Sequence, residues 1–329
     1  MRVLVTGGAG FIGSHFARRL VAGGDEVVVL DKLTYSGNRA NLEGVDAEFV
    51  EGDICDPDAV AEAGAGVDAV VNFAAETHVD RSILDAADFI ETDVHGTYVL
   101  LRWAREAGVR MVQVSTDEVY GDVPEGVLSR EDDPLRPSSP YSASKAGGDL
   151  QVLAAVRTFG VDACITRGGN TYGPNQYPEK LIPLFVTNAL DGEPLPLYGD
   201  GRQRRIWVHV EDHCAAVELV LRKGAAGEIY NIGGEDRDNL EITRRILELT
   251  GAGEELVRHV ADRPGHDRRY ALDDTKLRTL GWSPARSIAD SGLAETVEWY
   301  RDNRAWWEPI KSGAYREFYE RQYAARLNG

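Results

Sequence analysis

The first residues of the chain constrain its fold more than any others. A short apolar run, Arg2–Thr6, leads directly into glycines spaced three apart, at Gly7, Gly10 and Gly13. The stretch Phe11–Ala22 then carries apolar residues at helical spacing. A strand, a glycine turn and a helix in this order are typical of the first unit of a parallel α/β sheet that binds a dinucleotide.

Each glycine of the turn has a physical reason. One allows the tight turn, one lets a pyrophosphate approach the backbone, and one lets the helix pack closely on the strand. The helix N-terminus offers free N–H groups and a partial positive charge to phosphates. A purely structural glycine turn is the alternative. The expected cofactor contacts at this turn are Gly7, Gly10, Phe11, Ile12 and Gly13.

Two acids follow the next strands. Asp31 comes directly after the apolar run Glu26–Leu30, where its carboxylate is placed to accept hydrogen bonds from a ribose diol. This favours NAD over NADP, although the neighbouring Lys32 counts against that preference. Asp53 follows the third strand and is a candidate for the adenine amino group, with an exposed turn acid as an equal alternative.

Apolar strands and helical segments continue to alternate up to about residue 167. This pattern predicts a doubly wound parallel sheet of the Rossmann type, with helices on both faces. The further strands are expected at Ala47–Val50, Val67–Phe73, Arg110–Ser115 and Val161–Arg167, and the further helices at Asp56–Ala63, Asp88–Ala107 and Ser142–Phe159.

A chain of 329 residues suggests two domains. Prolines and glycines become frequent after about residue 170, where short strands and helices mix. We therefore expect a Rossmann domain over 1–167, with a later return near 206–222, and a smaller mixed α/β substrate domain over 168–329. A strand at Glu228–Ile232 and helices at Leu240–Leu249 and Ser291–Asn303 are expected in this second part.

The net charge of −18 and the pI of about 4.8 bear on partners and location. Nucleic acids and anionic membranes bind basic surfaces, so neither is expected as a partner. Three widely spaced cysteines, Cys55, Cys164 and Cys214, indicate a reducing compartment rather than a disulfide framework. The start of the chain lacks a signal-peptide pattern, and no apolar run is long enough to span a membrane. A cytoplasmic protein is expected.

A second motif carries acid–base chemistry. Tyr141 and Lys145 lie four apart, on one face of a predicted helix. A lysine ammonium beside the phenol favours phenolate and lowers the tyrosine pKa, so the tyrosine becomes a base near neutral pH. A surface Tyr/Lys pair is the alternative. Thr116, Asp117 and Glu118 follow the fifth strand, at the sheet edge where ligands bind. A solvated acidic turn is the alternative there.

Together these motifs resemble the extended short-chain dehydrogenase/reductases, and among them the family of dTDP-glucose 4,6-dehydratases. The resemblance runs from Arg2 to about Pro309. Its marks are TGGAGFIGSH, AAETHVDRS (Ala74–Ser82), STDEVYG, PYSASKA, NTYGPNQYPEKLIPLF (Asn170–Phe185), LPLYGDG (Leu195–Gly201) and DRPGHDRRYA (Asp262–Ala271). The Thr-Asp-Glu triplet is the most discriminating of them.

The resemblance implies oxidation of the sugar at C4, elimination of water across C5 and C6, and return of the hydride to C6, with NAD recycled. Tyr141 would take the O4 proton, Thr116 would bind O4, and Lys145 would hold the tyrosine and the cofactor ribose. Glu118 would remove the C5 proton and Asp117 would protonate the departing O6. Asp117 must then be protonated, and a neighbouring carboxylate in a closed pocket raises its pKa.

Binding residues are also implied by the resemblance, each with a surface or packing role as its alternative. For NAD they are, besides the glycine turn, Asp31 and Asp53, the residues Lys32, Leu33, Thr34, Ile54, Phe73, Ala74, Ala75, Thr92, Tyr141, Lys145 and Thr171. For a nucleotide-diphosphate sugar they are Thr77, Thr116, Asn170, Glu179, Lys180, Pro196, Tyr198, Arg205, Asn239, Arg263 and His266. A homodimer through the helices Asp88–Ala107 and Ser142–Phe159 is implied as well, with packing of these helices in the core of a single chain as the alternative.

Two departures from the family pattern stand out. Cys-Ser-Asn-Asn is replaced by Gly168-Gly169-Asn170-Thr171, and the acid of Arg-Asp-Trp is replaced by Ile206. The second change affects how Arg205 is oriented. The sequence therefore does not decide which nucleotide base and which sugar the substrate carries. A nucleotide-sugar 4-epimerase or oxidoreductase is the alternative enzyme, and an NAD-binding sensor is the alternative outside catalysis. His209 and His213 lack a third ligand, so no metal site is expected.

Overall fold

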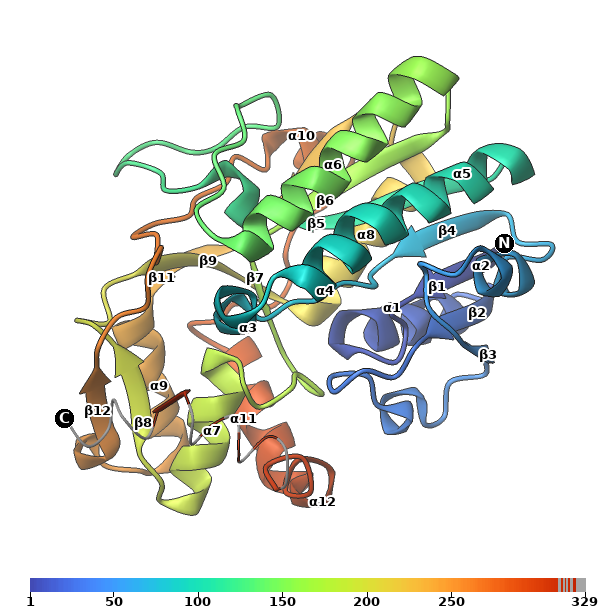
Figure 1. Cartoon of the computed structure of the whole chain (residues 1–329). Helices are drawn as coiled ribbons and strands as arrows, with labels where there is room; N and C mark the ends of the chain where they lie inside the picture. The colour runs from blue at the N-terminus through green and yellow to red at the C-terminus, as the bar shows by residue number, and fades with distance from the viewer. Residues whose placement is uncertain (313–314, 316, 318, 320–321, 324–329) are drawn as a thin grey trace.

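A computed structural model describes residues 1–312 together with 315, 317, 319, 322 and 323 (Figure 1). Its centre is a seven-stranded parallel sheet with the strand order β10-β6-β5-β4-β1-β2-β3. The order reverses between β1 and β4, which in such sheets opens a crevice at the carboxyl ends of the strands. The strands are β1 (Arg2–Thr6), β2 (Glu26–Asp31), β3 (Glu48–Glu51), β4 (Ala69–Asn72), β5 (Arg110–Thr116), β6 (Ala163–Gly168) and β10 (Ile229–Ile232). The predicted Rossmann architecture is confirmed.

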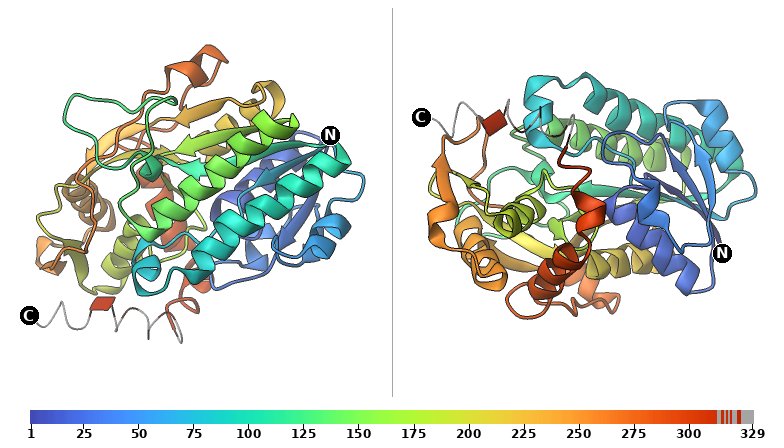
Figure 2. Two further views of the ribbon diagram at one scale, coloured as in Figure 1. Left: turned by 45° about the horizontal axis from the view of Figure 1, so that its top comes forward. Right: turned by 90° about the horizontal axis from the view of Figure 1, so that it is seen from below.

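Helices cover both faces of this sheet. Val3 and Val5 of β1 pack in the cluster with α1 (Phe11–Ala22) and α8 (Val210–Lys223), whereas Leu4 packs in the opposite cluster. That opposite face is covered by α2 (Pro57–Ala63), α5 (Thr97–Ala107) and α6 (Pro140–Phe159). Figure 2 shows α5 and α6 side by side across it. Burial on both faces explains why the strands are continuously apolar.

The C-terminal half builds a third apolar cluster beside the carboxyl edge of the sheet, around Phe185, Trp207 and Trp307. Its strands form two small sheets, of β11 (Glu235–Asp238), β9 (Arg204–His209) and β7 (Asn170–Tyr172), and of β12 (Val257–Val260) and β8 (Leu195–Tyr198). Its helices are α7 (Leu181–Asp191), α9 (Asn239–Thr250), α10 (Thr275–Thr279), α11 (Gly292–Asp302) and α12 (Arg304–Trp307). The remaining helical elements are the short α-helix α3 (Val79–Leu84) and the 3-10 turns η1 (Arg39–Leu42), η3 (Asp117–Tyr120) and η4 (Glu254–Leu256).

One strand lies elsewhere than expected. Residues 229–232 were expected in the second domain, but β10 pairs in parallel with β6 and forms the edge of the main sheet. The strand at 204–209 instead joins the small sheet of β7 and β11. The chain thus returns to the main sheet through α8 and β10. An apolar strand pattern indicates that a strand is buried but not which strand it pairs with. The sequence-based prediction therefore placed residues 229–232 in the wrong sheet. The assignment of cofactor and substrate roles to the two halves stays a prediction.

The expected helix Asp88–Ala107 is interrupted. It consists of α4 (Ala87–Ile90), a π-helical turn η2 (Glu91–Gly96) and α5. The extra residue in a π turn shifts which side chains face inward, and Thr92 and Asp93 are buried there. Such turns are frequent at functional sites.

In the part of the chain that the structure describes, no helix has both the length and the hydropathy required to cross a bilayer.

Candidate active site

A deep cleft lies at the carboxyl ends of the sheet strands. The glycine turn, the ends of β2 and β5, the start of α6 and the segment 168–171 line it. A second pocket, beside α7 and β8, shares Glu118, Asn170 and Lys180 with the cleft, so the two form one continuous site. All the predicted NAD contacts line the cleft except Leu33, which adopts a left-handed conformation with φ of 52°.

The glycine turn is built for close backbone approach. Gly7 has φ of 65°, a region that favours glycine, and a Cβ there would lie 2.6 Å from the Ala74 nitrogen. A Cβ at Gly13 would lie 2.3 Å from the Gly7 carbonyl oxygen, because α1 packs directly on the turn. A side chain at either position would collide with neighbouring backbone, so only glycine lets the turn pack this closely, as expected of a turn that binds the pyrophosphate of NAD.

The acid after β2 is fixed by the turn itself. The Asp31 carboxylate accepts hydrogen bonds from the N–H groups of Ala9 (2.9 Å) and Leu33 (2.8 Å), and burial raises its pKa. Each oxygen keeps acceptor capacity for a ribose hydroxyl. The Lys32 ammonium lies 3.3 Å from the Asp53 carboxylate, so its charge is already paired. That pairing agrees with NAD rather than with a phosphorylated ribose.

The two acids after β5 lie on the four-residue turn η3. Thr116 caps this turn: its hydroxyl oxygen accepts from the Glu118 N–H at 3.2 Å and its O–H donates to Asp117 at 3.2 Å. At the other end, the Tyr120 hydroxyl donates to the Asn231 side chain at 2.8 Å. The turn is therefore anchored on both sides.

Asp117 is 2% exposed, and its Oδ2 has no hydrogen-bond partner among the described residues. Burial, and next the charge of Glu118, raise the pKa of Asp117 to about 8, against the opposing effect of Arg205. The direction expected from the sequence is confirmed. Asp117 holds a proton at neutral pH, while Glu118 reaches both the cleft and the second pocket.

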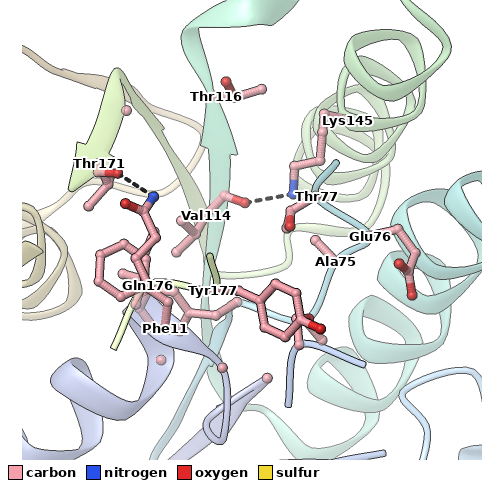
Figure 3. A pocket seen from close by; sticks show the side chains of 18 of the residues that line it. Phe11, Ala75, Glu76, Thr77, Val114, Thr116, Lys145, Thr171, Gln176 and Tyr177 are labelled. Atoms are coloured by element: carbon pink, nitrogen blue, oxygen red, sulfur yellow. Dashed lines mark hydrogen bonds between the residues drawn. The ribbon is translucent and has the colours of Figure 1, made fainter. Parts of the chain in front are cut away.

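The prediction for the tyrosine was wrong in direction. Burial raises the pKa of Tyr141 well above its ordinary value, and the charges of Glu118 and Asp93 add to the rise, against the opposing effect of a hydrogen bond with Thr116. The Lys145 ammonium does not offset this, because it donates to the Val114 carbonyl at 2.9 Å (Figure 3) and lies 3.9 Å from Asp93. The four-residue spacing predicted a shared face but not where the ammonium points.

The second pocket collects the predicted sugar-nucleotide contacts. Thr77 and Thr116 line the cleft, and the rest lie in the second pocket: Asn170, Glu179, Lys180, Pro196, Tyr198, Arg205, Asn239, Arg263 and His266. The Arg205 guanidinium donates to the carbonyls of Arg204 (2.8 Å) and Asp267 (3.0 Å) and stacks on Tyr270. Backbone carbonyls and a ring thus orient Arg205 without an acid at position 206.

Two of these residues are engaged with the protein itself. The buried Glu179 carboxylate accepts from the Tyr35 hydroxyl at 2.8 Å and from Arg81 at 3.2 Å. The Lys180 ammonium donates to the Thr77 carbonyl. Glu179 therefore ties α3 and the loop after β2 to this segment, while Lys180 stands where the cleft and the second pocket meet.

Some residues of the cleft were not expected from the sequence. The Thr171 hydroxyl, predicted to face NAD, is hydrogen-bonded at 2.7 Å to His213, which lines the cleft, and Gln176 donates to the Thr171 carbonyl at 2.9 Å (Figure 3). Burial lowers the pKa of His213 to about 4, so its ring is neutral. The sequence grouped His213 with His209, but the His209 ring accepts from the Glu211 N–H instead. Glu76 and Tyr177 also line the cleft; they lie within the motifs Ala74–Ser82 and Asn170–Phe185, but no role was predicted for either.

The close packing of the turn gives a first prediction. Replacing Gly13 with alanine is expected to lower the free energy of unfolding by about 1–3 kcal/mol, because its Cβ meets backbone that cannot yield. NAD binding is expected to weaken with it. Urea unfolding and calorimetric titration with NAD measure both effects.

Gly23→Ala, at the other end of α1, is the matched control. The nearest atom to its Cβ is 3.3 Å away, so a smaller loss is expected. Equal stability of the Gly13→Ala variant and the unchanged protein would contradict the prediction.

The model of the NAD dependent epimerase/dehydratase family matches residues 3–233. The chain therefore belongs to this family.

The relatives narrow the class further. A dTDP-glucose 4,6-dehydratase from Streptomyces niveus is 58% identical over 325 residues, which cover 95% of this chain and 96% of the relative. The solved dTDP-glucose 4,6-dehydratase from Streptomyces venezuelae with NAD bound has a TM-score of 0.92 and 59% identity, covering 94% of this chain and 100% of that one. The solved UDP-glucose 4-epimerase from Thermus thermophilus has a TM-score of 0.87 and 36% sequence identity, covering 92% of this chain and 100% of that one. Within the family, the chain groups with the dTDP-glucose 4,6-dehydratases.

Proposed function

We propose that this chain converts dTDP-glucose into the 4-keto-6-deoxy sugar nucleotide and that Thr116, Asp117, Glu118, Tyr141 and Lys145 carry the reaction. The observation that supports it most is the buried acid of Asp117, whose raised pKa keeps it protonated beside Glu118 at the end of β5. NAD, when bound, supplies reversible hydride transfer and ends each turnover in the state in which it began.

In the first stage the sugar is oxidised at C4. Thr116 hydrogen-bonds O4 and Tyr141 takes the O4 proton. The burial of Tyr141 opposes loss of its own proton, so Lys145 must turn from the Val114 carbonyl toward the phenol to stabilise the negative charge. Both groups lie on α6, whose start is fixed by the Ser139 capping box.

In the second stage water leaves across C5 and C6. The 4-keto group acidifies the C5 hydrogen, which Glu118 removes. Hydroxide is a poor leaving group, so Asp117 gives its proton to O6 as the C6–O6 bond breaks. Return of the hydride to C6 and of a proton to C5 then completes the 4-keto-6-deoxy product. A C4 epimerase needs neither of these carboxyl groups, and a sensor needs no acid or base at all. The buried acid pair therefore favours dehydration over both alternatives.

Incubation with dTDP-glucose and no added NAD tests the proposal. Loss of one water from the product mass, together with a 6-methyl NMR signal, is expected. An unchanged mass with inverted C4 would replace the proposal with epimerisation, and no turnover of any nucleotide sugar would favour a binding protein.

The raised pKa of Asp117 gives a pH prediction. The general acid is active while protonated, so the rate of water loss is expected to fall as the pH rises through about 8. Single-turnover measurements of product formation on both sides of that pH show the effect. A rate that stays constant or rises through this range would contradict the role of Asp117.

We further propose a homodimer in the cytoplasm. Support for the dimer comes from the face of α3, α4, α5 and α6, which leaves several large apolar side chains exposed: Ile83, Leu84, Ile90, Tyr98 and Leu150. Support for the location comes from the cysteines, because Cys55, Cys164 and Cys214 are all free thiols.

A further inference from the structure

The proposed reaction assigns no role to Asp93, although it is a buried carboxyl group beside the catalytic lysine. Asp93 lies in the π turn η2 and is 1% exposed. Its Oδ2 accepts a hydrogen bond from the Ser144 hydroxyl at 2.6 Å. Its Oδ1 lies 3.9 Å from the Lys145 ammonium and has no hydrogen-bond partner among the described residues.

The backbone holds Asp93 firmly against α6. A Cβ at Gly148 would lie only 2.7 Å from the Asp93 carbonyl oxygen, so η2 and α6 are in direct contact at this glycine. Lys145 precedes Gly148 by almost one helical turn, on the side that faces η2. The π turn thereby places a carboxylate beside the ammonium of the Tyr141–Lys145 pair.

We propose that Asp93 is a positioning residue that determines where the Lys145 ammonium points. When ionised, Asp93 retains Lys145 on the side of the Val114 carbonyl, and when protonated it releases Lys145 toward the Tyr141 phenol. Asp93 thus sets the pH range in which Tyr141 takes the O4 proton. The inference rests on the proposed role of Tyr141 as the base.

The electrostatics agree with this geometry. Burial raises the pKa of Asp93 to about 6, although Lys145 and Ser144 limit the rise, so Asp93 changes charge below neutral pH. The negative charge of Asp93 is in turn one cause of the raised pKa of Tyr141.

Other charged groups face this carboxyl group. Asp149 of α6 raises the pKa of Asp93 further. Glu76, in the segment after β4, is itself raised in pKa, chiefly by burial and in part by Asp93. Lys32 at the end of β2 reaches the neighbouring Thr92 at 3.4 Å but is paired with Asp53. Lys145 is the cation within ion-pair distance of Asp93.

The test isolates C4 oxidation with dTDP-6-deoxyglucose, which lacks the O6 leaving group and so accumulates reduced cofactor. The rate of this accumulation is measured against pH for the unchanged protein and for Asp93→Asn. Without the negative charge at position 93 the pKa of Tyr141 falls. The ascending limb of the pH–rate profile, where the rate of C4 oxidation increases with pH, is therefore expected to move by about one unit to lower pH. Ser144→Ala, which removes a hydrogen bond that favours ionised Asp93, is expected to move it in the same direction by less.

Asp88→Asn is the matched control, because it makes the same change at an exposed residue of α4 and is expected to leave the limb in place. A limb that stays in place in both Asp93→Asn and Ser144→Ala, or a rate lowered equally at every pH, would overturn the proposal. If Asp93→Asn does not fold, Ser144→Ala decides alone. Failure of the unchanged protein to oxidise the analogue or to dehydrate dTDP-glucose would count against the proposed function itself.

Discussion

Replacing Asp117 with asparagine is expected to slow water loss by about 10²–10⁴-fold while leaving C4 oxidation intact. Asparagine keeps the shape of the side chain and can still accept from the Thr116 hydroxyl, but its amide N–H is far too weak an acid to protonate O6. The oxidised sugar and the reduced cofactor should therefore accumulate after one turnover. Rapid-quench mass spectrometry and the absorbance of reduced nicotinamide measure the two steps separately.

The control is Asp122→Asn, the same change at an exposed carboxylate just beyond the turn η3. Its water loss is expected to match that of the unchanged protein. If Asp117→Asn also loses water at the normal rate, another group protonates O6 and the assignment of Asp117 is wrong.

The same variant is expected to alter stability in a pH-dependent way. The folded state raises the pKa of Asp117 from an ordinary value of 3.8 to about 8. The contribution of this group to stability is therefore fully present below pH 4 and is lost as the pH rises through 8. Asparagine does not titrate, so Asp117→Asn should gain stability relative to the unchanged protein across this window. Urea unfolding at several pH values measures that gain.

Replacing Glu118 with glutamine is expected to abolish exchange of the C5 hydrogen with solvent deuterium and to lower turnover by about 10²–10⁴-fold. The amide cannot accept a proton at neutral pH, although it fills the same space between the cleft and the second pocket. Oxidation at C4 requires Tyr141 and should persist. NMR of the sugar nucleotide recovered from deuterated buffer reports exchange directly.

Glu125→Gln is the control for this variant, because it makes the same substitution at an exposed residue of the following loop. Exchange at C5 should proceed normally in that protein. Undiminished exchange in Glu118→Gln would mean that a different group is the base at C5.

Much of the fold was predictable because its local and long-range signals agree. The glycine spacing at Gly7, Gly10 and Gly13 required a backbone cradle, and the contacts at Gly7 and Gly13 explain why no other residue fits. Continuous apolar strands indicated burial on both faces, and the two core clusters show it. The π turn η2 escaped detection, because one additional residue in a turn leaves the coarse helical periodicity almost unchanged.

The sequence predicted which residues line the site better than it predicted the pKa values of those residues. The raised pKa of Asp117 followed from a neighbouring acid in a closed pocket, and both causes are present. The pKa of Tyr141 did not follow from its spacing to Lys145, because it depends on burial and on Asp93, a residue far away in the sequence. Likewise His213 approaches Thr171 only after α8 packs against β7.

The turn η3 is anchored at both ends, and this bears on how enzymes built on this scaffold can come to form different products. Thr116 belongs to β5 and Tyr120 is held by Asn231, so the scaffold on either side of Asp117 and Glu118 is fixed without their side chains. The two acids can therefore vary without loss of these anchors, although Glu118 also contributes to the raised pKa of Tyr141 and lines the second pocket. The two acids between the anchors are therefore the smallest set of residues to change when protein engineering seeks a new product from the same sugar nucleotide.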